Sequence, residues 1–310
     1  MQATRIRIGT RGSPLALAQA HEVKERIIAA HRFAEDAVTI HVIKTTGDRV
    51  LDRPLSEIGG KGLFTKEIEE ALLSGEIDVA VHSMKDMQTV LPDGLVIGAV
   101  LPREDPRDAF ISLRHRDLAA LPENSVVGTS SLRRKAQILH TRPDLKVVDF
   151  RGNVQTRLRK LAEGVAEATF LAVAGLKRLK LEERITAPVS MEHMLPAVAQ
   201  GVIGLEIRDG DAAIVPITDS LNDATTAHAV AAERAFLARL EGSCRTPIAG
   251  HAVIKDGEVH FCGQLLSPEG AKCYDVSRQG KVEKAHDLGL SAADEILSQA
   301  DAALLVRSNA

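Results

Sequence analysis

Short apolar runs alternate with helix-like patterns through the first two-thirds of the chain. The runs typical of strands cover residues 5–9, 38–44, 78–82, 95–100, 126–128, 146–150 and 169–172. Patterns with helical spacing lie among them, at residues 14–30, 66–73, 132–139 and 154–163. This alternation is typical of βαβ units, in which helices cover mostly parallel sheets.

The alternation runs twice, which predicts two α/β lobes. Residues 101–110 hold two prolines and dense charge, as expected of a crossover between lobes. The apolar residues 195–208 then offer a strand that returns to the first lobe. Two crossings imply a hinge beside a cleft, which is a usual place for a ligand.

The last ninety residues follow a different pattern. A helix predicted over 225–240 precedes a loop, and apolar and polar residues then alternate on both sides of Asp256-Gly257, a strong hairpin signal. A third strand at 271–279 and a helix at 282–305 complete an α+β unit with a three-stranded antiparallel sheet. We therefore expect an α/β protein with domain 1 at 1–101 and 202–219, domain 2 at 102–201, and domain 3 at 220–310.

Composition narrows the class of protein. The 310 residues are 45% hydrophobic and 26% charged, which is ordinary for a globular protein, and no apolar run approaches the roughly 20 residues that cross a bilayer. The N-terminal residues lack the apolar core of a signal peptide, so a cytoplasmic location is expected. No zinc-spaced Cys/His cluster is present, which disfavours a metal site.

Charge is unevenly distributed although the net charge is only −3. Residues 131–160 contain nine Lys/Arg and two acidic residues, which indicates an anionic partner. Seven Phe, one Tyr and no Trp leave little for base stacking, so nucleic acid is not expected. Small carboxylates or phosphates fit the basic segment equally well.

Two strand ends in the first lobe carry candidate binding residues. GTRGSPLALAQA (9–20) predicts a helix capped by Ser13, with Arg11 beside amides that attract an anion; a plain capped helix explains the motif as well. VHSMKDM (81–87) places Ser83, Lys85 and Asp86 where α/β sheets bind ligands. A solvated loop is the alternative there, but a carboxylate in a cationic cleft can stabilise a cation or transfer a proton.

Two strand ends in the second lobe carry arginines. VVGTSSLRRKAQ (126–137) opens a helix on Thr129 and Ser131, followed by Arg133 and Arg134 in the first turn, which favours an anion site over a solvated basic face. FRGNVQTRLRKL (150–161) repeats this design. Arg151 and Arg157 there are suited to bind carboxylates through two hydrogen bonds each.

The loop GGKGLF (59–64) holds three glycines around Lys61 and leads into a helix. A long glycine-bearing loop beside a cleft is often a lid, although a disordered surface loop explains the same pattern.

Cys244 lies between Ser243 and Arg245 in a loop of small and polar residues. Such surroundings argue against a buried core cysteine, and a nearby arginine favours the reactive thiolate. Cys262 and Cys273 lie in alternating strand patterns and are expected in the core. The local residues leave open whether Cys244 is a nucleophile or an attachment point.

The motifs taken together resemble one family. RGSPLALAQA, GGKGLFTKEIE, VHSMKDM, VGTSSLRRKAQ, FRGNVQTRLRKL, AGLKRL and EGSCRTPIAGHA, in this order and spacing, are similar to those of the porphobilinogen deaminases (hydroxymethylbilane synthases). The resemblance covers essentially the whole chain. It implies a transferase of tetrapyrrole and heme biosynthesis that joins four porphobilinogen molecules head to tail into hydroxymethylbilane, with release of ammonia.

The resemblance also implies roles for individual residues. It makes Cys244 the thioether attachment point of a dipyrromethane cofactor and Asp86 the catalytic carboxylate, which would help ammonia leave and stabilise an azafulvene-like cation. The implied cofactor contacts are Ser83, Lys85, Asp86, Thr129, Ser131, Arg133 and Arg134. The implied substrate contacts are Arg11, Ser13, Arg151, Arg157 and Arg178, with Lys61 and Phe64 in a mobile loop. The implied fold has three domains, the first two like periplasmic binding proteins, in a monomer.

Four residues depart from the family pattern. Met87-Gln88 replace the common Val-Pro, Ala199 replaces a glycine, and Ser243 stands where glycine is usual. None of these changes removes a charged or covalent group.

Two other functions fit parts of the chain: a non-catalytic two-lobed binding protein for small polyanions, and a thiol hydrolase, for which the sequence places no partner histidine.

Overall fold

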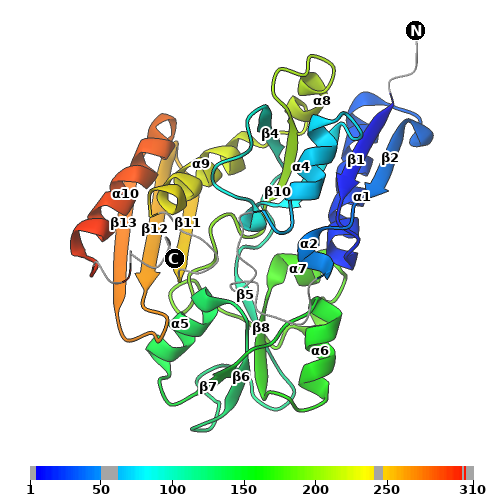
Figure 1. The fold of residues 1–310 in the computed structure, drawn as a ribbon. Helices are drawn as coiled ribbons and strands as arrows, with labels where there is room; N and C mark the ends of the chain where they lie inside the picture. The colour runs from blue at the N-terminus through cyan, green and yellow to red at the C-terminus, as the bar shows by residue number, and fades with distance from the viewer. Residues whose placement is uncertain (1–4, 50–61, 241–246, 302–303, 305–310) are drawn as a thin grey trace. The chain divides into compact units, whose positions relative to one another are not determined.

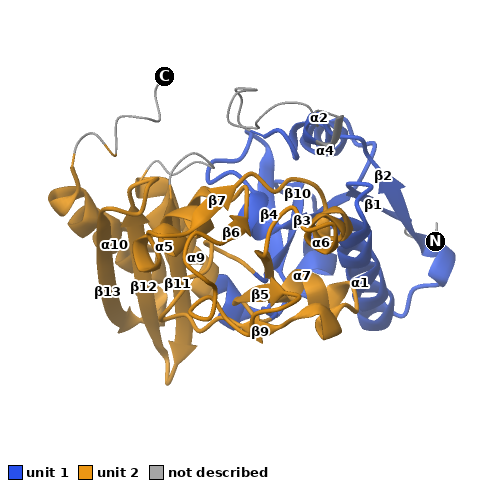
Figure 2. Ribbon diagram, turned by 90° about the horizontal axis from the view of Figure 1, so that it is seen from below, with its two compact units in different colours: residues 1–104, 201–227 blue, residues 105–200, 228–310 orange. Residues whose placement is uncertain are grey.

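The computed structural model describes residues 5–49, 62–240, 247–301 and 304. The chain divides into two compact units, Met1–Glu104 with Gly201–Ala227, and Asp105–Gln200 with His228–Ala310 (Figure 2). The second unit contains two separate sheets, each with hydrophobic clusters of its own. The three-domain division drawn from the sequence, which separates these two sheets, stays an interpretation.

The first unit contains a five-stranded sheet in the order β2-β1-β3-β10-β4 (Figure 1). Strands β1, β2 and β3 are parallel, and β10 pairs antiparallel with β3 and β4. Of the residues 195–208 predicted to return to the first lobe, 203–208 form a strand of this sheet, whereas the residues up to Gln200 belong to the second unit. The strand bounds are β1 Ile6–Thr10, β2 Val38–Val42, β3 Val79–Ser83, β4 Leu95–Val100 and β10 Ile203–Arg208.

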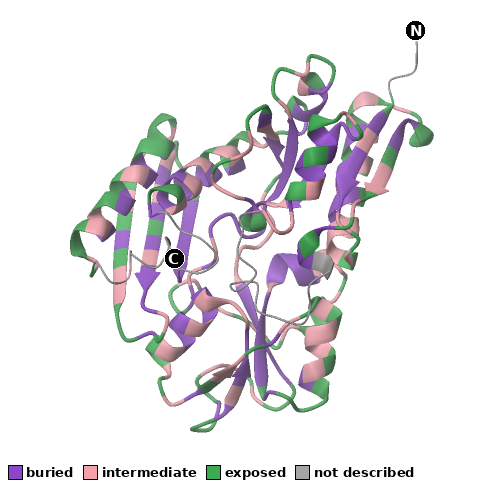
Figure 3. Cartoon of the chain, in the orientation of Figure 1, coloured by how far each residue is buried: buried purple, intermediate pink, exposed green. Residues whose placement is uncertain are grey.

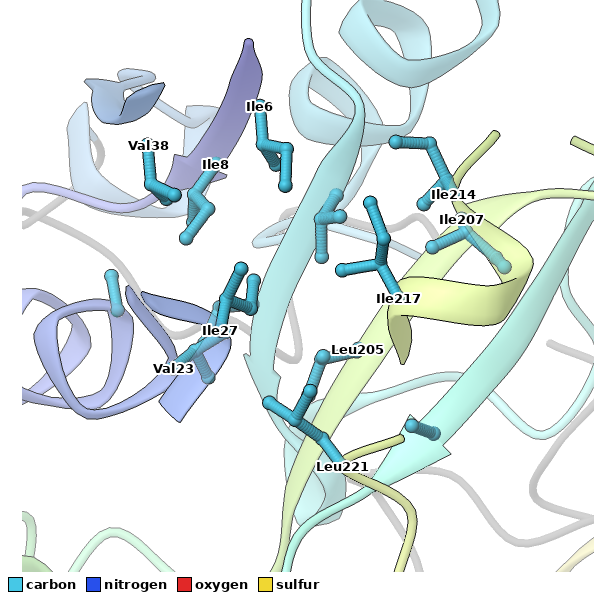
Figure 4. Close-up of a cluster of buried hydrophobic side chains, with 14 of the residues drawn as sticks. Ile6, Ile8, Val23, Ile27, Val38, Leu205, Ile207, Ile214, Ile217 and Leu221 are labelled. Carbon is cyan, nitrogen blue, oxygen red and sulfur yellow. The ribbon is translucent and has the colours of Figure 1, made fainter. Parts of the chain in front are cut away.

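The two faces of this sheet are covered by different helices. One face, with α1 (Pro14–His31) and α8 (Val215–Asp219), forms a cluster of buried hydrophobic side chains (Figure 4). Its strand residues include Val79, Val81 and Leu205. Strand alternation turns Ala80 to the other face, where it packs with residues of α4 (Lys66–Leu73). The short helix α2 (Thr46–Arg49) precedes α4.

The second unit begins with a five-stranded sheet in the order β7-β6-β8-β5-β9. Its strands are β5 Asp108–Ser112, β6 Val126–Gly128, β7 Lys146–Val148, β8 Ala168–Ala172 and β9 Ala187–Pro188. Its helices are α5 Leu132–Thr141, α6 Val154–Ala162 and α7 Val173–Arg178. The sequence assigned residues 101–110 wholly to a crossover, whereas β5 begins at Asp108 and is buried along its whole length.

The third sheet confirms the predicted three-stranded antiparallel arrangement. Strands β11 (Ile248–Lys255) and β12 (Glu258–Leu266) form a hairpin, and β13 (Cys273–Lys281) pairs with β12. The hairpin turn places both Asp256 and Gly257 at positive φ, as the sequence signal requires. Helices α9 (Ala224–Arg239) and α10 (Ala285–Gln299) contribute to the core of this sheet.

The expectation that Cys262 lies in the core is wrong. Buried positions alternate with more exposed ones along β12 (Figure 3). Val259 and Phe261 are among the buried residues, and the alternation turns Cys262 outward, where it is exposed. Cys273 is half-buried, and burial together with the neighbouring Asp275 carboxylate raises the pKa of its thiol to about 12. The thiolate of Cys273, its reactive form, is therefore disfavoured.

No helix within the described residues is long and apolar enough to cross a membrane.

Gly289 permits a close approach of α10 to α9. A Cβ at this position would lie 2.1 Å from the backbone oxygen of Ala232, and a backbone atom cannot move aside as a flexible side chain can. We expect Gly289→Ala to lower the free energy of unfolding by roughly 1–3 kcal/mol, because overpacking outweighs the gain of about 1 kcal/mol in helix propensity.

Denaturant unfolding measures this change. Ser291→Ala, at an exposed position on the same helix, is the matched control and should alter stability by less than about 0.5 kcal/mol. A Gly289→Ala protein as stable as the control would contradict the close helix contact.

Candidate functional site

The first unit contains a pocket at the carboxyl ends of β1 and β3. These strands are parallel neighbours, so the residues that follow them emerge at the same edge of the sheet. The turn after β1 contributes Arg11 and Ser13, and the 3₁₀ turn Met84–Asp86 after β3 contributes Asp86. The lining residues are Arg11, Ser13, Leu15, Ala16, Gln19, Phe64, Thr65, Val81, His82, Ser83, Asp86 and Met87.

Hydrogen bonds to α1 hold two hydroxyl groups of this pocket in place, those of Ser13 and Ser83. Ser13 caps α1 by accepting a hydrogen bond from the backbone N–H of Ala16, as predicted. The Ser83 hydroxyl and the buried Gln19 amide contact each other at 2.9 Å and 3.1 Å. Gln19 projects from α1 onto the end of β3, so the helix that supplies the apolar core also fixes a pocket hydroxyl.

Phe64 covers the guanidinium of Arg11, whose Cζ lies 4.1 Å from the centre of the ring. A cation over an aromatic face gains about 0.5–1 kcal/mol at a partly exposed site. Gly47 packs closely against the same ring: a Cβ there would lie 2.3 Å from its Cε1 atom. The backbone N–H of Gly47 also donates to the Leu63 carbonyl at 2.7 Å. The pocket therefore combines a cation, an aromatic face and the Asp86 carboxylate.

In the second unit, helix α5 opens on hydroxyl groups as predicted. Ser131 accepts a hydrogen bond from the backbone N–H of Arg134, and Thr129 accepts one from the N–H of Ser131. The adjoining strand end is tied to this turn, because the N–H of Phe150 donates to the Ser130 hydroxyl at 3.0 Å. The carboxyl ends of the parallel strands β6 and β7 thus bring their polar turns together.

Arg133 and Arg134 are buried and share one carboxylate, Asp108. The nearest guanidinium nitrogens lie 2.8 Å and 2.7 Å from its oxygens. Burial alone would raise the pKa of Asp108, but the two arginine charges outweigh burial and hold it well below the usual range. Burial lowers the pKa of Arg133, and the charge of Asp108 opposes that effect. The sequence did not indicate this buried partner.

Arg151 and Arg157 are half-buried and contact groups close to them in sequence. Arg151 donates from Nε to Asp149 at 2.7 Å, and Arg157 donates from Nε to the Gly152 carbonyl at 2.9 Å. Burial would raise the pKa of Asp149, but hydrogen bonds from Ser130 and Arg151 outweigh it and lower the pKa. Both arginines lie beside the turn after β7, as the sequence predicted.

The remaining predicted residues are spread more widely. Lys85 is exposed and is not among the residues that line the first-unit pocket, although it belongs to the same 3₁₀ turn as Asp86. Arg178 ends α7 in the second unit. Lys61 and Cys244 lie outside the described residues. Among the residues that the structure describes, no His/Cys/Asp/Glu group could hold a metal ion.

Three of the four departures from the family pattern lie within the described ranges. Met87 is buried and lines the pocket beside Asp86, and Gln88 follows it. Ala199 is buried and adopts φ of 57°, a conformation that costs an alanine roughly 1–2 kcal/mol and glycine much less. Its N–H donates to the buried Glu233 carboxylate at 2.6 Å, which holds the backbone there. Ser243 falls outside the described residues.

Comparison with known proteins identifies one family across the chain. Residues 6–216 match the family described as porphobilinogen deaminase, dipyromethane cofactor binding domain, and residues 227–298 match the porphobilinogen deaminase C-terminal domain. The chain is 57% identical to the porphobilinogen deaminase of Paracoccus denitrificans, over 96% of this chain and 95% of the relative. It is also 57% identical to the chloroplastic porphobilinogen deaminase of Pisum sativum, over 95% of this chain and 82% of the relative.

Among solved structures, a putative methionine-binding lipoprotein of Bacillus subtilis aligns with 71% of this chain and 91% of its own. The identity is 12% and the TM-score is 0.45.

The buried group of Asp108, Arg133 and Arg134 yields a stability prediction. Asp108→Asn leaves two buried guanidiniums without a counter-charge, which we expect to cost roughly 3–5 kcal/mol of unfolding free energy at neutral pH. Because the folded pKa of Asp108 is depressed, its contribution is complete above its unfolded pKa of about 4 and is lost as pH falls below that value. The difference between wild type and variant should therefore shrink in acid.

Denaturant unfolding at neutral pH and at pH values below about 4 tests both parts. Asp144→Asn is the matched control, because Asp144 also pairs with an arginine in this unit but at the surface. It should cost far less than Asp108→Asn. Equal losses for the two variants would contradict the assigned role of Asp108.

Proposed function

The chain belongs to the porphobilinogen deaminase family, and from this premise we propose that the first-unit pocket carries the family's reaction. In that reaction porphobilinogen molecules are joined head to tail, with release of ammonia, to give hydroxymethylbilane for tetrapyrrole biosynthesis. One observation carries the proposal: Arg11, Ser83 and Asp86, which come from two neighbouring strand ends, line the same pocket.

Asp86 is proposed as the catalytic carboxylate. It is exposed at the pocket edge, where a carboxylate can stabilise the positive charge that develops on a pyrrole as its amine leaves. The same group can accept a proton when the attacked pyrrole carbon loses it. Met87 and Val81 add apolar surface to the lining, which strengthens these electrostatic effects by excluding water.

Arginines are proposed to bind the acetate and propionate groups of the pyrroles. In the first unit this role falls to Arg11, assisted by the Ser13 hydroxyl. In the second unit we assign it to Arg151, Arg157 and Arg178. Guanidinium groups match carboxylates in shape and retain their charge throughout the working pH range, which explains an arginine-rich site in a chain of net charge −3.

The donor groups fit a dipyrromethane cofactor, which carries several carboxylates. Arg133 and Arg134 share a single buried carboxylate, so this group retains an excess positive charge that a cofactor carboxylate would balance. We propose Ser83 and Lys85 in the first unit, and Thr129, Ser131, Arg133 and Arg134 in the second, as cofactor contacts, with Cys244 as the attachment point. When bound, the cofactor supplies the primer to which pyrrole units are added.

A non-catalytic binding protein for small polyanions is the alternative function. It would use the arginines but would have no need of a carboxylate in the pocket or of a covalent cofactor. The match of residues 6–216 to the family's cofactor-binding domain favours the enzyme. A monomeric state and a cytoplasmic location are proposed from the family resemblance.

The covalent cofactor gives the first test of this function. Intact-protein mass spectrometry should show an adduct of two linked pyrrole units on the active wild-type protein, and Cys244→Ala should lack both the adduct and the activity. Cys262→Ala is the matched control and should retain both, because Cys262 lies on the outer face of β12. An unmodified but active wild-type protein would overturn the assignment of Cys244.

Asp86 gives the second test. Asp86→Asn should lower kcat for porphobilinogen about 10²–10⁴-fold while the protein stays folded, because only the charge and the proton transfer are removed. Ammonia release measures turnover, and thermal unfolding confirms the fold. Asp93→Asn, at an exposed position away from the pocket lining, should be fully active. Near-normal turnover in Asp86→Asn would rule out the proposed role.

A further inference from the structure

A buried group of three ionisable side chains lies behind the wall of the first-unit pocket. Glu69 comes from α4, His82 from β3 and Glu206 from β10, with exposed fractions of 4%, 6% and 0%. His82 Nε2 lies 3.0 Å from Glu206 Oε2. Charged residues are rarely buried to this extent without a function or a complete set of partners, so the group requires an explanation.

Strand pairing explains how these residues meet. In the antiparallel pair, His82 lies opposite Gly204, and Glu206 lies opposite Ala80. Ala80 and His82 are two residues apart, so they face the same side of the sheet, as does Glu206. This is the side that α4 covers with Ile68 and Leu72, and Glu69 follows Ile68 along that helix.

The hydrogen bonding of the group is incomplete. Among the described residues, Glu69 Oε1 and Glu206 Oε1 are buried and have no hydrogen-bond partner. A buried carboxylate oxygen without a donor costs roughly 1–3 kcal/mol or more. A proton on a carboxyl group removes that cost, because it cancels the charge and supplies a donor. The two open carboxyl oxygens therefore give the group places at which a proton can be taken up.

The surrounding charges act in the same direction. Burial raises the pKa of Glu69, and the charges of Glu206 and Glu70 add to the rise, whereas the Thr65 hydroxyl and His82 oppose it. Other charged groups near α4 have partners elsewhere: Lys66 contacts Glu70, and Arg208 contacts Asp78 and Asp211. Arg7 also pairs with Asp78. On the pocket side, the charged lining residues besides His82 are Arg11 and Asp86.

His82 connects this group to the pocket. His82 is one of the residues that line the pocket, together with Ser83 and Asp86, whereas Glu69 and Glu206 are not among them. An imidazole can pass a proton from one side to the other, because it has two ring nitrogens. One of these nitrogens already contacts Glu206.

We propose that Glu69, His82 and Glu206 form a proton-holding site, and that His82 transfers a proton between this site and the pocket in each reaction cycle. The inference rests on the proposed function of the pocket. Each condensation breaks the C–N bond of a protonated aminomethyl group, and both bond electrons leave with ammonia. A C–C bond then forms, and the attacked pyrrole carbon loses one proton. That proton is held by the site until ammonia takes it up as ammonium, so the balance closes.

In this scheme Asp86 accepts the proton that the attacked pyrrole carbon loses, and His82 receives that proton from Asp86 within the pocket. Glu69 and Glu206 are positioning residues, which act on the substrate only through His82. A purely structural role for the two carboxyl groups would affect stability alone. A role in proton transfer would also affect the titration of His82 and the pH dependence of kcat.

The experiment combines nitrogen-15 NMR of the histidine rings with steady-state kinetics on the cofactor-loaded enzyme. His82→Asn assigns the ring signals. Glu206→Gln preserves the size of the side chain and removes the carboxylate that favours the charged imidazole. The pH dependence of the His82 ring signals should differ from that of the wild type, and kcat should fall about tenfold with little change in KM. The kcat–pH profile should change together with the NMR signals.

Glu69→Gln provides a second variant should Glu206→Gln fold poorly, and it should alter the same His82 signals by a smaller amount. Glu25→Gln is the matched control: Glu25 is exposed on α1, the helix that covers the opposite face of the sheet, and its replacement should change neither measurement. An unchanged His82 titration and kcat–pH profile in both test variants would overturn the proposal.

The outcome is distinguishable from a failure of the proposed function. An inactive Asp86→Asn protein together with unaltered Glu206→Gln and Glu69→Gln proteins would retain the pocket assignment and reject proton transfer through His82. An active Asp86→Asn protein would reject the pocket assignment and with it the transfer role. The NMR titration, which needs no turnover, would still show whether the carboxylates control the charge of His82.

Discussion

The second unit is organised around one fully buried carboxylate, that of Asp108. It accepts hydrogen bonds from Arg134 and from Gln200, and it lies 2.8 Å from a nitrogen of Arg133. The arginines extend these contacts, because Arg134 donates to the Phe170 carbonyl and Arg133 to the Leu195 carbonyl. One residue at the start of β5 thereby fixes the start of α5, the strand β8 and the segment that leads out of the unit. A charge buried this deeply is tolerated because two guanidinium groups lie within ion-pair distance of it.

The first unit depends on a different feature, the alternation of apolar and polar side chains along β3 and β10. One face of both strands is apolar and packs on α1, whereas the other carries His82 and Glu206 beneath α4. The apolar face gives the sheet its stability and the polar face gives it chemistry. Both faces meet at the edge of the sheet where β3 ends at Ser83. The turn that follows this strand carries Asp86. The pocket therefore lies at the ends of the strands, at the border of the packed sheet.

Much of this fold follows from patterns that are local in sequence. Strands β4 and β6 and helix α4 have the predicted bounds, because each is marked by an apolar period with a clear start and stop. Asp256-Gly257 fixes the hairpin since few dipeptides accept positive φ at both positions. Strand β5 escaped prediction because its first residue is a charged one, preceded by prolines and further charges, and nothing nearby in sequence reveals the counter-charges that allow it to be buried.

The candidate site shows the same limit. Arg133 and Arg134 were interpreted as an anion site, and the structure adds an anion that belongs to the chain itself, 25 and 26 residues earlier in sequence. Gln19, His82 and Glu206 were missed because each resembles an ordinary helix or strand residue until the sheet brings them to one edge. A sequence pattern predicts which groups emerge at a strand end. It does not predict which pairs form in the interior, because pairing depends on contacts between distant segments.

The partial pairing of these arginines has a physical consequence for binding. Two guanidiniums against one carboxylate leave a surplus of one positive charge in a buried setting, where charge is poorly screened. If both arginine charges were neutralised, the two residues would have no affinity for a further carboxylate. If neither had a counter-charge, the buried charges would destabilise the fold. We propose that the intermediate state is stable enough to form and still attracts an anion. A ligand that carries many carboxylates could thus be bound by a chain whose overall charge is slightly negative, since the attraction is set by the local surplus and not by the net charge.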